Sequence, residues 1–208
     1  MDYYHISAEE LGQGAKIRLE FPGDSPAVFF EMAQDMVRTI REHNAAGAKT
    51  VFICPVGPVG QYPYFVKMVN DERLSLKDCW FINMDEYLTD DDEWIDASDG
   101  LSFRGFMDRV VYSQIDPELV MSPEQRIFPD PKDPGHVAEV IPYRAVTIGM
   151  AEILGARKVR LGVFREWHRG AVRRAAYGKV TAAFPATLLQ NHPDAVIYVN
   201  DVARERAY

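Results

Sequence analysis

The sequence predicts an α/β fold in which a mainly parallel sheet lies between helices, a three-layer, Rossmann-like arrangement. Short continuous apolar runs, such as TVFIC at 50–54 and DAVIYVN at 194–200, indicate buried strands. Amphipathic segments with helical spacing alternate with these runs, and Gly- and Pro-rich turns separate the two. The chain has 208 residues, so we expect a single α/β domain over 1–208.

The first expected helix begins at Ser25, whose hydroxyl can cap it, with Pro26 in the first turn. Apolar residues from Phe29 to Ile40 then recur at helical spacing. Gly47 is placed to end this helix.

Further along the chain, apolar or β-branched runs predict strands, and segments with helical spacing predict helices. In chain order these are a strand at 50–54, a helix at 64–69, a strand at 78–84, a helix at 101–115, a strand at 125–130, a helix at 143–154, a strand at 158–164, a helix at 168–178 closed by Gly178, and a strand at 194–200.

The composition restricts the possible partners and compartments. The net charge of -8 disfavours nucleic acid, although a small basic pocket can still hold an anionic metabolite. Cys54 and Cys79 lie in apolar runs and indicate buried thiols in a reducing compartment. Neither a secretory signal nor a membrane-spanning run is evident, so we expect a cytoplasmic protein without a membrane partner.

Two features are expected at one edge of the sheet, because ligands of such folds bind beyond the carboxyl ends of the strands. The turn PVGPVG at 55–60 precedes a helix and can hold an anion, or it can be a purely structural turn. Asp85 and Glu86 follow the apolar run that ends at Ile82, and they are candidates for proton transfer or solvated loop acids. No Cys, His and Asp cluster has metal-ligand spacing, and we expect neither a metal nor a cofactor.

Several stretches together resemble the glucosamine-6-phosphate deaminases (isomerases). They are FINMDEYL, LSFRGFM, IPYRAVTIGMAEILGARKVRLGVF and FPATLLQNHPDAVIYVND, in the order in which that family has them. The resemblance covers most of the chain from about Ser25 onward. The related 6-phosphogluconolactonases share the fold, but their strand-end motif usually reads Asp-Glu-Arg, and Tyr87 here favours the deaminases.

The resemblance implies a sugar-phosphate aldose–ketose isomerase or deaminase acting on glucosamine 6-phosphate or a related amino-sugar phosphate, with a possible homo-oligomeric state. Asp85 corresponds to the carboxylate that moves a proton between C2 and C1, and His136 to the ring-opening histidine. Glu139 stands near the family's catalytic Glu, two positions early. The phosphate-binding loop of the family corresponds to the turn that contains Gly57, Val59 and Gly60.

The chain also departs from the family pattern. Val59 replaces a phosphate-binding Thr or Ser, and His168 replaces a phosphate-binding Lys, for which Arg165 and Arg169 are expected to substitute. The segment expected near 135–141 is shortened, either by a real deletion or because the sequence omits it. Two alternatives therefore stay open: a 6-phosphogluconolactonase-like hydrolase in which His136 activates water, and a non-catalytic sugar-phosphate-binding homologue.

Overall fold

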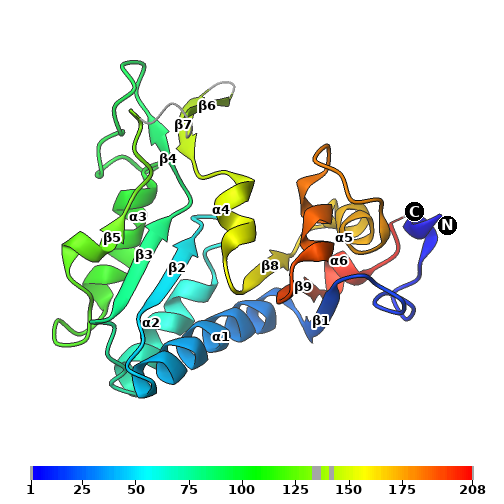
Figure 1. Cartoon of the computed structure of the whole chain (residues 1–208), viewed down its shortest axis with the longest axis horizontal. Helices are drawn as coiled ribbons and strands as arrows, with labels where there is room; N and C mark the ends of the chain where they lie inside the picture. Colours follow the sequence, from blue (N-terminus) through cyan, green and yellow to red (C-terminus); the bar gives the residue numbers. More distant parts are fainter. Residues whose placement is uncertain (1, 133–136, 141–142, 208) are drawn as a thin grey trace. The chain divides into compact units, whose positions relative to one another are not determined.

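The structure is a computed structural model that describes residues 2–132, 137–140 and 143–207, with only the backbone described at 137–140 and 143–144. The chain divides into two compact units, residues 1–32 with 150–208, and residues 33–149. The single domain over 1–208 stays a prediction. The α/β class is confirmed, since parallel strands are flanked by helices in both units (Figure 1).

The first unit is built on a parallel sheet in the order β1-β9-β8. Its elements are η1 (Tyr3–His5), β1 (Arg18–Gly23), α4 (Met150–Gly155), β8 (Val159–Val163), α5 (His168–Tyr177), η4 (Pro185–Asn191), β9 (Ala195–Asn200) and α6 (Asp201–Arg204). The expected strands at 158–164 and 194–200 and the helix at 168–178 are confirmed, whereas β1 was not predicted. β9 is buried along its whole length, as its continuous apolar run requires.

The second unit contains a parallel sheet in the order β2-β3-β5 and an antiparallel sheet in the order β4-β7-β6 (Figure 1). Its elements are β2 (Thr50–Cys54), α2 (Gln61–Asp71), β3 (Cys79–Asn83), β4 (Asp85–Leu88), α3 (Phe103–Val110), η2 (Tyr112–Gln114), η3 (Pro123–Gln125), β5 (Arg126–Ile127), β6 (Val137–Val140) and β7 (Tyr143–Thr147). The predicted strands at 50–54 and 78–84 pair in parallel, with Thr50 opposite Cys79 and Cys54 opposite Asn83.

α1 (Ser25–Ala45) begins in the first unit and continues into the second. The prediction that Ser25 caps it was wrong in detail. The carboxylate of Asp24 accepts a hydrogen bond from the Ala27 N–H at 2.9 Å, while the Ser25 hydroxyl accepts one from the Asn200 side chain. Gly47, with φ at +64°, follows the end of the helix as expected.

The prediction of a helix at 143–154 was also wrong. Residues Tyr143–Thr147 form β7, and only Met150–Gly155 form a helix. β7 pairs along its length with β4, and its aromatic and β-branched residues suit a strand as well as a helix face. The sequence did not reveal the strand, because the spacing of the apolar residues in this segment fits both the period of a strand and that of a helix.

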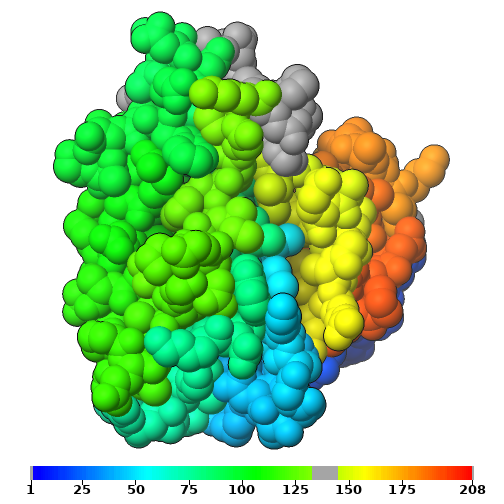
Figure 2. Space-filling view, turned by 60° about the vertical axis from the view of Figure 1, so that its left-hand side comes forward, coloured from blue at the N-terminus to red at the C-terminus, as the bar shows by residue number. Residues whose placement is uncertain are grey.

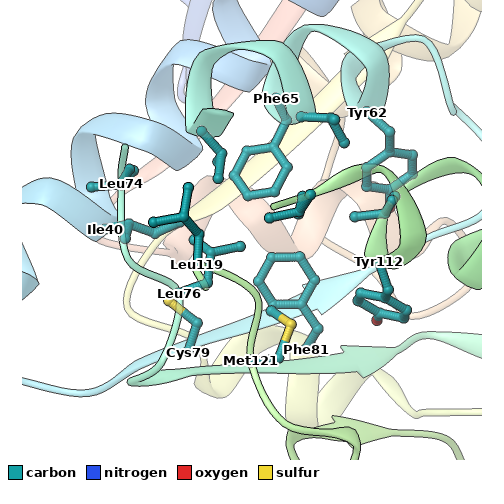
Figure 3. Close-up of a cluster of buried hydrophobic side chains, with 14 of the residues drawn as sticks. Ile40, Tyr62, Phe65, Leu74, Leu76, Cys79, Phe81, Tyr112, Leu119 and Met121 are labelled. Carbon is teal, nitrogen blue, oxygen red and sulfur yellow. The ribbon is translucent and has the colours of Figure 1, made fainter. Parts of the chain in front are cut away.

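The core of the second unit packs one face of β3 against α2, α3 and η2. Figure 3 shows Phe65, Phe81 and Tyr112 together with Ile40, Leu76 and Met121. Cys54 and Cys79 are buried free thiols, as expected, and burial raises the pKa of each to about 12. Among the described residues, no helix has the length and apolar character to cross a bilayer.

Candidate functional site

Asp85 lies just beyond the carboxyl end of β3, where the chain contacts the ends of β2 and β7. β3 ends at Asn83, and the next residue, Met84, is held by its backbone. Its N–H donates to the carbonyl of Cys54 at 2.9 Å, and its carbonyl accepts from the N–H of Ile148 at 2.9 Å. Asp85 then opens β4 and stands opposite Thr147 of β7. Of the two alternatives left open, the solvated loop acid does not hold for Asp85, because Asp85 lies in a strand whose pairing fixes its backbone.

The neighbouring acid, Glu86, has a different role. The side chains of successive strand residues point to opposite faces, and that of Glu86 is fully buried, whereas Asp85 is only partly buried. Glu86 accepts hydrogen bonds from the N–H groups of Phe103 (2.9 Å) and Arg104 (2.8 Å) at the start of α3.

Two further donors complete the surroundings of Glu86. Its carboxylate also accepts from the Ser102 hydroxyl (3.1 Å) and from the Tyr87 N–H (2.9 Å). The Arg104 Nε lies 3.4 Å from Oε2, which is an ion pair without hydrogen-bond geometry. The contacts with Ser102, Phe103 and Arg104 tie Glu86 to the N-terminus of α3, so its carboxylate has a structural role.

Asp85 has the electrostatic character expected of a group that exchanges protons. Its partial burial raises the pKa of its carboxyl from the ordinary 3.8 to about 6, and the negative charge of Glu86 adds to the shift. A carboxyl with such a pKa is largely ionised at neutral pH yet binds a proton readily.

The turn at 55–60 lies at the same sheet edge, because it follows Cys54, the β-sheet partner of Asn83. Gly57 has φ at +150° and is exposed, and Val59 is 37% exposed. Gly60 is the N-cap of α2 and provides no side-chain cap. The side chain of Gln61 donates to the carbonyl of Pro58 at 2.9 Å, while its buried Oε1 has no partner among the described residues.

Asn83 is a candidate that sequence reasoning did not single out. Its side chain is fully buried, and neither amide atom has a hydrogen-bond partner in the described part of the chain. Buried amides are normally paired, so this one stands out at the end of β3. The available signal was a polar residue closing an otherwise apolar strand.

The predicted basic group lies in the first unit at the start of α5. The Nδ1 of His168 accepts hydrogen bonds from the N–H groups of Phe164 (2.8 Å) and Arg165 (3.1 Å). Burial, and then the charge of Arg165, lowers the pKa of His168. Arg169 donates through Nε to the carbonyl of Val202 at 2.9 Å. Since the turn at 55–60 belongs to the other unit, its expected pairing with this basic group stays a prediction.

Two further residues, His136 and Glu139, were predicted to be catalytic. His136 lies outside the described residues. Glu139 is in β6, where its backbone stands opposite Arg144 of β7. The shortening expected near 135–141 stays a prediction. Within the described residues, no three His, Cys, Asp or Glu side chains group as a metal site.

Curated glucosamine-6-phosphate deaminases match part of the chain, although no protein-family model does. The enzyme of Staphylococcus saprophyticus is 35% identical over 89 residues, which are 43% of this chain and 34% of that protein. The enzyme of Enterococcus faecalis is 35% identical over 68 residues, 33% of this chain and 29% of that protein. The chain is therefore similar in sequence to part of the glucosamine-6-phosphate deaminases. It matches these curated deaminases over roughly a third of their length.

Solved structures show the same fold over nearly the whole chain. A monomeric glucosamine-6-phosphate deaminase aligns with a TM-score of 0.77 and 18% identity, covering 90% of this chain and 98% of its own. The 6-phosphogluconolactonase from Trypanosoma cruzi aligns with a TM-score of 0.66 and 12% identity, covering 90% and 95%. The deaminases and lactonases therefore share this architecture, and the likeness shows the fold alone.

Proposed function

We propose that the protein is a sugar-phosphate isomerase or deaminase that acts on glucosamine 6-phosphate or a related amino-sugar phosphate. The environment of Asp85 is the observation that carries the proposal. Of the two adjacent acids, Glu86 is saturated by four hydrogen bonds, whereas Asp85 is partly exposed with a pKa of about 6. The sequence similarity to curated deaminases supports the choice of substrate class.

In the proposed reaction, the Asp85 carboxylate removes the proton from C2 of the open-chain sugar. The electron pair of that bond forms the C1–C2 double bond of an enediol-type intermediate, and the C1 carbonyl oxygen takes up a proton from water. Asp85 then returns its proton to C1, and in the amino sugar the resulting imine at C2 reacts with water and releases ammonia. Each proton leaves one atom and reaches another, so the step needs no oxidant or reductant.

The turn at 55–60 is the proposed site of the phosphate group. It precedes α2, so the backbone N–H groups at the start of that helix and the helix dipole favour an anion there. His136 is proposed as the ring-opening group, on the resemblance alone. Arg165, His168 and Arg169 are proposed as additional phosphate ligands on the same ground.

The experiment is turnover of glucosamine 6-phosphate, followed as ammonia and ketose phosphate, with the wild type and Asp85→Asn. We expect turnover by the wild type and a loss of about 10²-fold or more in the variant. No turnover of this sugar or of related aldose phosphates by the wild type would reject the proposal. Hydrolysis of 6-phosphogluconolactone that survives Asp85→Asn would favour a lactonase instead.

A further inference from the structure

A cavity of about 300 Å³ opens in the second unit, between α3, η2 and the segments before and after them. The segments that line it, within residues 97–128, are coloured green to yellow-green in Figure 2. Three of its lining residues are arginines, and the others that matter here are one acid and two aromatic residues: Arg104, Arg109, Arg126, Asp108, Tyr112 and Phe128. Asp85 and the turn at 55–60 are not among the lining residues.

Two of the guanidinium groups are held in place by aromatic rings. The Arg104 guanidinium lies 4.8 Å from the ring centroid of Trp94, and that of Arg126 lies 4.5 Å from the ring centroid of Tyr112. Both arginines are largely buried, with 23% and 19% of their side chains exposed. A guanidinium that stacks by its face keeps its N–H edge available for a ligand.

The hydrogen bonds within the protein use only some of the arginine donors. One amino group of Arg104 donates to the carbonyl of Ile95 at 2.6 Å, and one of Arg109 to that of Ala97 at 3.0 Å. Arg126 donates through Nη2 to the carbonyl of Met121 at 3.0 Å, and its buried Nε has no partner among the described residues. Each guanidinium has five N–H groups, so donors remain at all three.

Carboxylates lie near two of the three arginines of the cavity. Asp108 is the lining acid, and it is 68% exposed with its oxygen 3.9 Å from Arg126. The buried carboxylate of Glu86 forms an ion pair with Arg104. Asp96 also interacts with Arg104, and Glu124 with Arg126, so Arg109 is the lining arginine without a carboxylate partner among the described residues. An anion would relieve the repulsion between the arginines.

Tyr112 provides an independent sign of a ligand. It is only 4% exposed, and its hydroxyl has no hydrogen-bond partner in the described part of the chain. Figure 3 shows that this hydroxyl points away from Phe65. Burial raises the pKa of Tyr112, so the hydroxyl stays protonated and can donate. A buried hydroxyl without a partner is costly unless a ligand or water satisfies it.

We propose that this cavity is a second anion-binding site, which takes a phosphate monoester with a small organic group. The phosphate oxygens accept hydrogen bonds from Arg109, Arg126 and the Tyr112 hydroxyl, an arrangement that suits a doubly charged group. Phe128 and the Tyr112 ring offer apolar contacts to the organic part. The volume is at the lower end of the range for small-molecule pockets, so the organic group is small.

The test is calorimetric titration of the full chain with phenyl phosphate and with inorganic phosphate, at low and high salt. We expect binding to the cavity with an affinity that falls as salt increases. Arg126→Ala and Arg109→Ala should each weaken phenyl phosphate binding about tenfold or more. Tyr112→Phe should weaken binding without lowering the melting temperature, because it removes only a hydroxyl that has no partner. Arg18→Ala, an exposed arginine of β1 paired with Glu20, is the matched control and should bind as the wild type does.

Backbone amide chemical shifts on addition of phenyl phosphate locate the site. Shifts at 104–112 and 126 support the proposal, and shifts at 55–61 instead would overturn it. Absence of binding at millimolar concentration, or equal affinity in all the pocket variants, would overturn it too. Asp85→Asn should leave this binding unchanged, so failure of the proposed enzyme activity and failure of this site are distinguishable.

Discussion

Glu86→Gln tests whether the buried carboxylate of β4 holds the start of α3. Each oxygen of Glu86 accepts two hydrogen bonds: Oε1 from the N–H groups of Tyr87 and Phe103, and Oε2 from the Ser102 hydroxyl and the Arg104 N–H. Glutamine has the same volume but only one acceptor oxygen, so its NH₂ group would face two donors.

The expected cost follows from the two bonds that glutamine cannot accept. A hydrogen bond to a charged group contributes about 1.5–3 kcal/mol, so the loss of two predicts about 3–6 kcal/mol. Removing one partner of a buried ion pair costs about the same. Such a loss is a large part of the stability of an ordinary domain, about 5–15 kcal/mol.

Urea unfolding followed by circular dichroism and by tryptophan fluorescence measures the change in the free energy of unfolding. The matched control is Glu93→Gln, since Glu93 is 64% exposed and lies 3.5 Å from Lys132. Its change should stay below about 1 kcal/mol. Hydrogen exchange should also show lost protection at the amides of Phe103 and Arg104. A Glu86→Gln protein within about 1 kcal/mol of the wild type would refute the structural role of this carboxylate.

Two further predictions concern Asp85 and Gly105. The pKa of the Asp85 carboxyl is about 6 in the folded protein and 3.8 ordinarily, so protonation of Asp85 stabilises the folded state. This contribution to stability is fully present below pH 3.8 and is lost as the pH rises through about 6. Asp85→Asn should therefore melt above the wild type at about pH 8 and near it at about pH 4, and a pH-independent difference would contradict the shift. A Cβ on Gly105 would lie 1.8 Å from the carbonyl oxygen of Ala97, so Gly105→Ala should cost about 1–3 kcal/mol or more in thermal unfolding. Gly155→Ala, with nothing within 4 Å of its Cβ, is the control, and equal melting temperatures would refute the clash.

The elements that were predictable from sequence are those whose pattern has a single interpretation. The continuous apolar runs at 50–54 and 79–83 became β2 and β3, because a buried parallel strand has few alternatives. Residues 143–147 were assigned to a helix because their apolar spacing fits both periods, and the pairing with β4 decides for the strand. Asp24 replaces Ser25 as the cap, a choice between adjacent residues with equal propensity.

The candidate site was predictable only in part, for a similar reason. The apolar run before Asp85 indicates a strand-end acid, but this pattern does not separate Asp85 from Glu86, and only the family resemblance assigned the proton transfer to Asp85. Their difference arises from the strand alternation and from the distant N-terminus of α3. The arginine cavity was not predicted, because Arg104 and Arg126 come together only when α3 packs near β5.

The central claim is that Asp85 moves a proton between two carbons of an amino-sugar phosphate. The most direct measurement is proton NMR of glucosamine 6-phosphate incubated with the protein in deuterium oxide. With the wild type, the account predicts that the C2 proton is lost and that C1 of the ketose product gains either that proton or, where Asp85 has exchanged it with solvent, deuterium. Asp85→Asn should show neither. The rate of exchange in the wild type should fall as the pH decreases through about 6, since protonation of Asp85 removes the base. Exchange that persists in Asp85→Asn at the wild-type rate would contradict the account.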